Sequence, residues 1–391
     1  MKIINKIMKK VHNRLEKESK EVGKTLIFGT DAGALKILED CFNGELEQSG
    51  IIGFVDNEVN CDKIWDLPVY CLNNISVSYD RIIIMDENNY STLSNQLYFG
   101  YGIPKYKIMK RNYLLYLRII WKYRDSKDPE IKQTIANITG KTYFDYWCDY
   151  CPKAGKLYPI YWDKERNMPY TFYYEKKMYF PRNKKFILEE GKQYVRGLEF
   201  EQQEGSPHTY ITEKNEIKKG DVLIDAGVCE GNFALKYIDR VSKVYLIECD
   251  PDWIYPLQLT FEPYADKVVF CTKFLGKNNS ESTVSLDTLI GTDKVDFIKM
   301  DIEGAEVDAL LGGKSVFQNN NLKCAICSYH KHDDEKKIKQ LLVEYGYAVT
   351  TSRGYMIFHG DSERFKYSEL RRGVVYGIKE NSYNNKIQSV N

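Results

Sequence analysis

Residues 221–240 read DVLIDAGVCEGNFALKYIDR, and this stretch decides the fold class. Its apolar run from Val222 to Asp225 is typical of a buried strand, a turn with Gly227 and Gly231 follows, and a helix comes next. Glycine in such a turn lets the backbone approach a ligand closely, and the helix N-terminus offers unpaired N–H groups. The stretch therefore predicts a nucleotide site in a doubly wound α/β domain.

The next expected strand, VYLIECD at 244–250, ends near Glu248, 23 residues beyond Asp225. In doubly wound folds an acidic residue about 20 residues further on accepts hydrogen bonds from ribose hydroxyls. A dinucleotide site would carry G-x-G-x-x-G, whereas this turn carries the carboxylates of Asp225 and Glu230, which repel a pyrophosphate. Carboxylates favour a ligand with a cationic amino-acid end and an adenosine end, namely S-adenosylmethionine.

Three further motifs follow in order: VSLDTLI at 284–290, VDFIKMDIEGAEVDALLGG at 295–313 and CAICSYHKHDD at 324–334. Together with the first two stretches they resemble the FkbM-type class I methyltransferases over roughly 165–380. The family's glycine turn usually reads D-x-G-A-N-x-G, and this chain departs from it at Val228-Cys229-Glu230. The resemblance implies a second Rossmann-like sheet, closed by an antiparallel hairpin formed from 346–353 and 373–379.

The resemblance also implies S-adenosylmethionine-dependent methylation, commonly on a hydroxyl of a sugar or secondary metabolite. It assigns the methionine end of the cofactor to Asp225, Gly227 and Gly231, the ribose to Glu248, and the adenine to the neighbourhood of Cys249 and Asp250. Glu230 and Asn232 join the cofactor set as part of the same turn. Upstream, Glu204 and His208 are candidates to close over the cofactor.

Asp301, Glu303 and His330 are the candidate catalytic residues, because they follow expected strands at the edge where doubly wound folds bind ligands. Acidic residues also favour helix N-termini, so Asp301 and Glu303 have a structural alternative, and His330 could be a buried, hydrogen-bonded histidine. Asp301, Glu303 and Glu306 are oxygen ligands of the kind that Mg²⁺ accepts. A divalent metal is therefore left open, although the sequence does not require one.

The N-terminal region alternates strand-like and helix-like segments and predicts a small Rossmann-like domain over 22–115. Its turn at 29–33, Gly-Thr-Asp-Ala-Gly, and Asp56 after the second strand suggest a nucleotide or nucleotide-sugar site. The pattern resembles the nucleotide-binding-like N-terminal domains of enzymes that tailor surface sugars. A degenerate docking domain remains the alternative.

The remaining segments are interpreted by composition. Residues 1–21 are expected to form a basic amphipathic helix, and 381–391 a polar tail. Residues 116–164 are expected to form a helical, aromatic-rich connector, since 14 aromatic residues lie between 141 and 180. Most of these rings are expected to pack between domains, with one or two available to a substrate cleft.

The 391 residues carry a net charge of +1, which argues against a nucleic-acid partner. No apolar run reaches the roughly 20 residues of a membrane span. Ten cysteines, several in strand-like runs, indicate reduced thiols and a cytoplasmic location. We expect a methyltransferase acting in surface-glycan synthesis on a small-molecule or glycan-linked acceptor, and an oligomer is left open. An NAD-dependent sugar oxidoreductase or epimerase and a non-catalytic scaffold are the alternatives.

Overall fold

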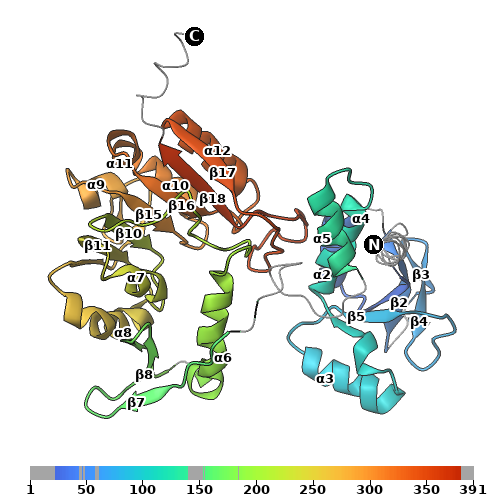
Figure 1. Ribbon diagram of the computed structural model, residues 1–391. Helices are drawn as coiled ribbons and strands as arrows, with labels where there is room; N and C mark the ends of the chain where they lie inside the picture. The colour runs from blue at the N-terminus through green and yellow to red at the C-terminus, as the bar shows by residue number, and fades with distance from the viewer. Residues whose placement is uncertain are drawn as a thin grey trace, which may run out of the picture. The chain divides into compact units, whose positions relative to one another are not determined.

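Two α/β units make up the chain (Figure 1). The first comprises Met1–Asp149 and Ile357–Leu370, and the second Tyr150–Met356 and Arg371–Asn391. The computed structural model describes residues 23–43, 46, 49–57, 61–139, 153, 155–183 and 185–379, with only the backbone at 185–190. The expected basic helix at 1–21 and the polar tail at 381–391 lie outside these residues. None of the described helices is long and apolar enough to cross a membrane.

The first unit contains a six-stranded sheet in the order β3-β4-β2-β1-β5-β6. All pairings are parallel except that of β3 with β4. Its strands are β1 (Thr25–Phe28), β2 (Ile51–Asp56), β3 (Lys63–Ile64), β4 (Leu67–Cys71), β5 (Arg81–Ile84) and β6 (Ile108–Lys110). Its helices are α2 (Ala32–Phe42), α3 (Tyr90–Asn95), η2 (Gln96–Gly100), η3 (Lys105–Lys107), α4 (Tyr113–Tyr123) and α5 (Pro129–Ile138). The alternation expected from the sequence is therefore present.

The domain boundaries expected from the sequence, 22–115 and 165–380, stay predictions. The structure adds one feature that they do not contain, because Ile357–Leu370 belongs to the first unit. Within that unit, Tyr116 Oη lies 2.9 Å from His359 Nε2, and Arg364 Nε donates to Asn112 Oδ1 at 3.2 Å. These contacts join the late segment to α4 and to the residue that precedes it.

The second unit contains a seven-stranded sheet in the order β12-β11-β10-β15-β16-β18-β17. Neighbours from β12 to β16 are parallel, whereas β18 is antiparallel to both β16 and β17. The strands are β10 (Val222–Ala226), β11 (Lys243–Ile247), β12 (Val268–Cys271), β15 (Phe297–Met300), β16 (Lys323–Cys327), β17 (Tyr347–Thr351) and β18 (Val374–Lys379). This sheet confirms the expected doubly wound fold and its closing antiparallel strands.

Helices cover this sheet, and smaller strands extend the unit. The helices are α6 (Lys185–Glu201), α7 (Asn232–Tyr237), α8 (Pro251–Phe261), η4 (Glu262–Tyr264), α9 (Leu286–Ile290), α10 (Glu306–Leu311), α11 (Lys314–Asn319) and α12 (Asp334–Glu344). The smaller strands are β7 (Tyr161–Asp163), β8 (Met168–Tyr173), β9 (Lys176–Tyr179), β13 (Phe274–Leu275) and β14 (Thr283–Val284). Tyr179 N donates to Thr260 Oγ1 at 2.9 Å, which joins β9 to α8.

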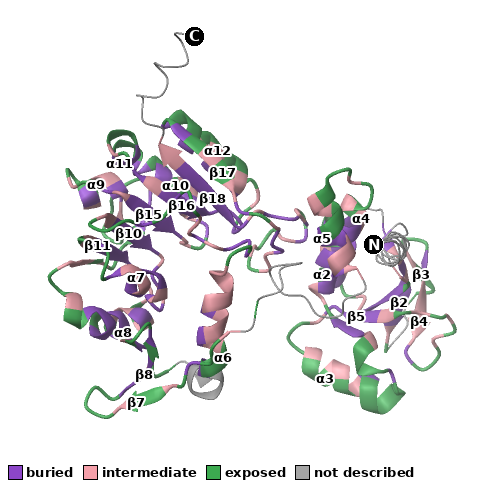
Figure 2. Ribbon diagram, viewed as in Figure 1, coloured by how far each residue is buried: buried purple, intermediate pink, exposed green. Residues whose placement is uncertain are grey.

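The central strands of the second unit are buried on both faces, as Figure 2 shows for β10, β15 and β16. Near-continuous apolar runs are what parallel strands between two helical layers require. Strand β15, with the sequence FIKM, is buried at all four positions, including Lys299. A lysine in such a run must have an anionic or carbonyl partner, because burial of an unpaired ammonium group is costly.

Two glycines with negative φ test how tightly the second unit is packed. A Cβ added at Gly312 would lie 2.1 Å from the backbone oxygen of Gly276, whereas one at Gly197, in helix α6, would meet nothing within 4 Å. We expect Gly312→Ala to lower the free energy of unfolding by about 1–3 kcal/mol through overpacking. Gly197→Ala, the matched control, should raise it by about 0.4–1 kcal/mol, because alanine has less conformational entropy in the unfolded chain. Urea denaturation measures both, and equal stability of the two variants would contradict the packing at Gly312.

Candidate active site

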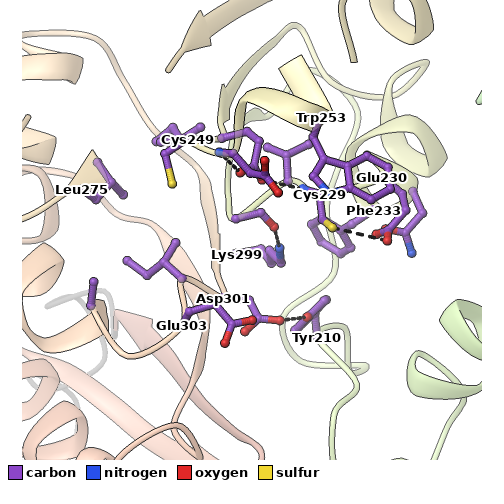
Figure 3. A pocket seen from close by; sticks show the side chains of 18 of the residues that line it. Tyr210, Cys229, Glu230, Phe233, Cys249, Trp253, Leu275, Lys299, Asp301 and Glu303 are labelled. Atoms are coloured by element: carbon purple, nitrogen blue, oxygen red, sulfur yellow. Dashed lines mark hydrogen bonds between the residues drawn. The ribbon is translucent and has the colours of Figure 1, made fainter. Parts of the chain in front are cut away.

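A cavity of about 550 Å³ opens at the carboxyl ends of β10, β11 and β15. Gly227 follows β10, Glu248 follows β11 and Asp301 follows β15, and all three line the cavity. Figure 3 shows Cys249 and Trp253 at one end, and Asp301, Glu303 and Tyr210 at the other. The cavity therefore lies where doubly wound sheets bind ligands.

The turn after β10 requires glycine at two positions. Gly227 has φ +74°, and an added Cβ would lie 1.6 Å from the backbone oxygen of Asp301. Gly231 has φ +79°, and its Cβ would lie 2.8 Å from the ring of Phe261. Side chains rarely adopt this left-handed conformation, and here no space exists for one. The turn is thereby pressed against the end of β15.

Asp225 lies beneath the turn, outside the lining of the cavity. Its carboxylate is fully buried, 3.0 Å from Lys299 Nζ, and accepts a hydrogen bond from Ala234 N at 3.2 Å. Lys299 also donates to the carbonyl oxygens of Ala226, at 3.3 Å, and Gly227. Burial alone would lower the pKa of Lys299, but Asp225 and Asp301 outweigh it and raise the pKa. Asp225 therefore holds the turn in place through a charged lysine.

Most of the expected cofactor residues line the cavity. They are Gly227, Glu230, Asn232, Glu248, Cys249 and Asp250, whereas Gly231 is not among the lining residues. Glu248 accepts hydrogen bonds from Cys229 N and Asp250 N, both at 2.8 Å. A carboxylate has about four lone-pair sites, so Glu248 keeps acceptor capacity for a ligand. Burial, with the nearby charges of Glu248 and Asp301, raises the pKa of Glu230 to about 7.

Asp301 lies at the other end, between two histidines. Its Oδ2 accepts a hydrogen bond from Tyr210 Oη at 2.7 Å and lies 3.5 Å from His208 Nε2. Its Oδ1 lies 3.4 Å from His330 Nε2. Burial would raise the pKa of Asp301, but His208, His330 and Lys299 outweigh it and hold the pKa well below its usual range. Asp301 is thus an ionised carboxylate in a largely buried position.

Each histidine is backed by a second carboxylate. His208 Nδ1 lies 3.6 Å from Glu201 Oε2, and His330 Nδ1 lies 3.0 Å from Glu306 Oε1. Burial alone would lower the pKa of His208, but Asp301 and Glu201 raise it to about 9. Burial alone would also lower the pKa of His330, but Glu306, which has the largest opposing effect, raises it together with Asp301 and Glu303. Carboxylates and imidazoles therefore alternate from Glu201 to Glu306 through Asp301.

The three acidic residues of the IKMDIEGAE motif have different surroundings. Asp301 lines the cavity, Glu306 is fully buried, and Glu303 lines the cavity with 85% of its side chain exposed. Glu306 Oε1 also accepts a hydrogen bond from Ile302 N at 2.9 Å. The motif thus brings two carboxylates to the cavity and places the third beneath it.

The sequence did not single out several residues that line the cavity, among them Tyr210, Trp253, Phe274 and Lys299. Lys299 had a signal, since a lysine inside the buried run FIKM needs a buried partner. His208, expected as a cover over the cofactor, is instead buried beside Asp301, and Glu204 is exposed and outside the cavity lining. Tyr210 lies in a loop, Trp253 at the start of α8 and Phe274 in the two-residue strand β13, where no spacing rule applies.

The expected nucleotide turn of the first unit is occupied by its own side chains. Asp31 caps α2 and accepts hydrogen bonds from Gly33 N at 2.9 Å and Ala34 N at 3.0 Å. Thr30 Oγ1 donates to Asp56 Oδ2 at 2.5 Å. The N–H groups that would bind a phosphate already have an anionic partner. A nucleotide at this turn stays a prediction without added support.

Solved structures with similar folds include methyltransferases. Methyltransferase FkbM from Methylobacillus flagellatus KT is 15% identical, with 93% of this chain and 92% of that chain covered and a TM-score of 0.39. Precorrin-6y C5,15-methyltransferase from Geobacter metallireducens GS-15 is 16% identical, covering 42% of this chain and 85% of that one, with a TM-score of 0.30. Magnesium protoporphyrin IX methyltransferase from Synechocystis PCC 6803, solved with bound S-adenosylmethionine, is 13% identical, covering 41% and 71%, with a TM-score of 0.28. No curated protein matches the chain.

A protein-family model matches part of the second unit. The model described as Methyltransferase FkbM domain matches residues 275–349, which include β15, the IKMDIEGAE motif and His330. These residues supply Asp301 and its neighbours at one end of the cavity. Over residues 275–349 the chain thus matches the FkbM methyltransferase domain, and this match identifies it as a methyltransferase.

Proposed function

We propose that the enzyme transfers the methyl group of S-adenosylmethionine to a hydroxyl, or to an amine, of a sugar or sugar-linked group in surface-glycan synthesis. The cavity with its two chemically distinct ends carries the proposal. One end offers Cys249 and Trp253, and the other offers Asp301 and Glu303 (Figure 3). Glu248, which precedes Cys249 in the chain, also lines the cavity. A cytoplasmic location is part of the same proposal.

The residues at the first end fit the cofactor by their chemistry. Glu248 can accept hydrogen bonds from ribose hydroxyls, and the Trp253 and Phe274 rings line the same cavity and can pack against an adenine. Glu230, in the glycine turn, offers a carboxylate to the ammonium group of the methionine end. Gly227 and Gly231 hold the turn in a left-handed conformation that leaves no room for a Cβ against Asp301 and Phe261, and this backbone path brings Glu230 to the cavity.

The bound cofactor supplies a methyl group on a positively charged sulfur. The transfer would break the methyl–sulfur bond with its electron pair left on sulfur, form a methyl–oxygen bond, and pass the hydroxyl proton to the carboxylate of Asp301 or Glu303. Asp301 and Glu303 can accept a hydrogen bond from that hydroxyl and orient it for in-line attack. Positioning of this kind is worth up to about 7–11 kcal/mol of the barrier for well-oriented reactants.

The function as a whole is tested by mass spectrometry of surface glycans from source cells with and without the gene. Loss of a methyl group as 14 daltons, one CH₂, would support the proposal and identify the acceptor. Calorimetry with S-adenosylhomocysteine, the demethylated product, tests the cofactor separately on the full chain. Unchanged glycans together with absent product binding would refute the proposal.

Replacing Glu248 by glutamine should weaken the binding of S-adenosylhomocysteine. The variant loses charge-assisted hydrogen bonds to the ribose, each worth about 1.5–3 kcal/mol, or roughly a tenfold to hundredfold change in Kd. Glu281→Gln, at an exposed position outside the cavity lining, is the matched control and should bind as the wild type does. Calorimetry measures both, and equal affinities would exclude the ribose role of Glu248.

Product binding should also depend on pH through Glu230, whose pKa lies near 7. The carboxyl is largely protonated below that pKa and ionised above it, and only the ionised form attracts the ligand's ammonium group. Affinity should therefore rise between pH 6 and pH 8, by roughly tenfold if binding lowers the pKa of Glu230 by about one unit. Calorimetry should show proton release near pH 7. Glu230→Gln should remove both effects, and their persistence in this variant would assign them to another group.

Asp301→Asn should reduce turnover with the identified acceptor while product affinity stays nearly unchanged. Asparagine keeps the size of aspartate but cannot take a proton, and general-base catalysis contributes about 10²- to 10⁴-fold. Steady-state kinetics and calorimetry measure the two quantities. Full turnover in Asp301→Asn would remove this residue from the reaction, and loss of product binding would move it to the cofactor site.

A further inference from the structure

We propose that Asp301 and His330, joined by Glu303, bind a divalent transition-metal cation at the acceptor end of the cavity. This cation would bind the hydroxyl oxygen of the acceptor and hold it in line with the transferable methyl group. The inference rests on the proposed function only for that second role. Cation binding itself can be tested without an acceptor or a cofactor.

The distances among the donor atoms suit a common cation. His330 Nε2 lies 3.4 Å from Asp301 Oδ1 and 3.7 Å from Glu303 Oε2. Neighbouring donors around a cation are about 3.0–3.5 Å apart when each bond is about 2.0–2.2 Å and the bond angles are about 90–110°. Only a small movement of Glu303 is needed to bring its oxygen into this range.

The surroundings of His330 and Asp301 orient these donors. A metal-binding histidine usually directs its other ring nitrogen to a carboxylate or carbonyl, which fixes the ring. Here His330 Nδ1 lies 3.0 Å from Glu306 Oε1, which is held by Ile302 N. Asp301 Oδ2 is held by Tyr210 Oη, and Oδ1, which accepts a hydrogen bond from Tyr329 Oη at 3.3 Å, lies 3.4 Å from His330 Nε2. Both donors are thus positioned before any cation arrives.

The buried charge next to His330 is a second observation that bears on the proposed site. Asp301, Glu306 and His330 offer ligand atoms within 4.8 Å of one another. Glu306 is fully buried, and its Oε2 has no hydrogen-bond partner among the described residues. A buried acceptor without a donor costs about 1–3 kcal/mol or more. Glu306 lies on the Nδ1 side of His330, so a dication bound at Nε2 would offset its negative charge from across the ring.

Glu303 completes the site from a strained backbone. It has φ +55°, in the left-handed region that residues other than glycine seldom adopt, and precedes Gly304 at φ +94°. Such strain persists mainly at functional sites. Its side chain is 85% exposed, so it can move toward His330 without breaking a packed contact. Exposure of this carboxylate leaves the cavity side of the site open to an acceptor oxygen.

The donor set favours one class of cation. One imidazole nitrogen and two carboxylate oxygens suit Mn²⁺, Fe²⁺, Co²⁺ or Zn²⁺, whereas Ca²⁺ prefers oxygen donors alone. A second group, His208, Asp301 and Cys327, is also compact. That group contains no exposed donor such as Glu303, and neither His208 nor Cys327 lines the cavity. That group leaves no position for an acceptor.

The test is a Mn²⁺ titration of the full chain after removal of metals by chelator dialysis. Electron paramagnetic resonance of free Mn²⁺ gives stoichiometry and Kd. We expect one site with a Kd below about 1 mM, weakened at least about tenfold by His330→Ala and by Glu303→Gln. His332→Ala is the matched control, because its Nε2 lies 3.4 Å from Asp333 Oδ1 and it is not one of the proposed donors, and it should bind as the wild type does.

Two results would overturn the proposal: no saturable binding by the wild type, or equal binding by the wild type and Glu303→Gln. Glu303 is exposed, so its replacement keeps the fold and decides the matter even if His330→Ala does not fold. Calorimetry with S-adenosylhomocysteine on the same samples separates the two hypotheses. Product binding without Mn²⁺ binding refutes the metal site alone, whereas absent product binding refutes the proposed function.

Discussion

The ion pair between Lys299 and Asp225 is the interaction on which the cavity depends. Lys299 extends from the centre of β15 to the turn after β10, where it binds the Asp225 carboxylate and two backbone carbonyl oxygens. Both side chains are buried, so removing either one would leave an unpaired charge, at a cost of about 3–5 kcal/mol. The pair thereby fixes the distance between the glycine turn and Asp301. This distance explains why position 227 is a glycine: the turn passes so close to the Asp301 backbone that no Cβ fits there.

The sequence was sufficient to predict the central strand, the glycine turn and the acid after the second strand, because each has a local pattern. Hydrophobic runs, positive-φ glycines and the separation between Asp225 and Glu248 are properties of short segments. The pairing of Asp301 with His208 is different, since these residues are 93 positions apart and approach only when the loop before β10 folds over the end of β15. No periodicity in the sequence encodes that contact. The expected role of Asp225 in cofactor binding stays a prediction. The structure places it under the turn, and a carboxylate under the turn and one facing the ligand have the same local pattern.

The two units show why a strand–glycine–helix pattern does not by itself make a nucleotide site. In the first unit, Asp31 takes the free N–H groups at the start of α2, and Thr30 and Asp56 bind each other. In the second unit, the residue that precedes α7 is Gly231, which has no side chain to cap the helix. The carboxylate that reaches this helix is Asp225, which lies beneath the turn and accepts from Ala234 N, the third residue of α7. The two turns thus differ in the residue that precedes the helix, Asp31 in one and Gly231 in the other. The number of glycines in each turn does not reveal this difference.

The charge of the cavity in the second unit argues against a dinucleotide and for a cationic cofactor. Its lining contains six carboxylates, from Glu201, Glu230, Glu248, Asp250, Asp301 and Glu303, but only two lysines, Lys273 and Lys299. Lys299 already compensates Asp225, so its charge is not available to a ligand. A pyrophosphate would bring two more negative charges into this field, whereas a sulfonium and an ammonium group would bring two positive ones. The same field lowers the cost of placing a sulfonium beside Asp301, and this is the physical reason why a turn rich in carboxylates can replace the phosphate-binding glycine loop of dinucleotide enzymes.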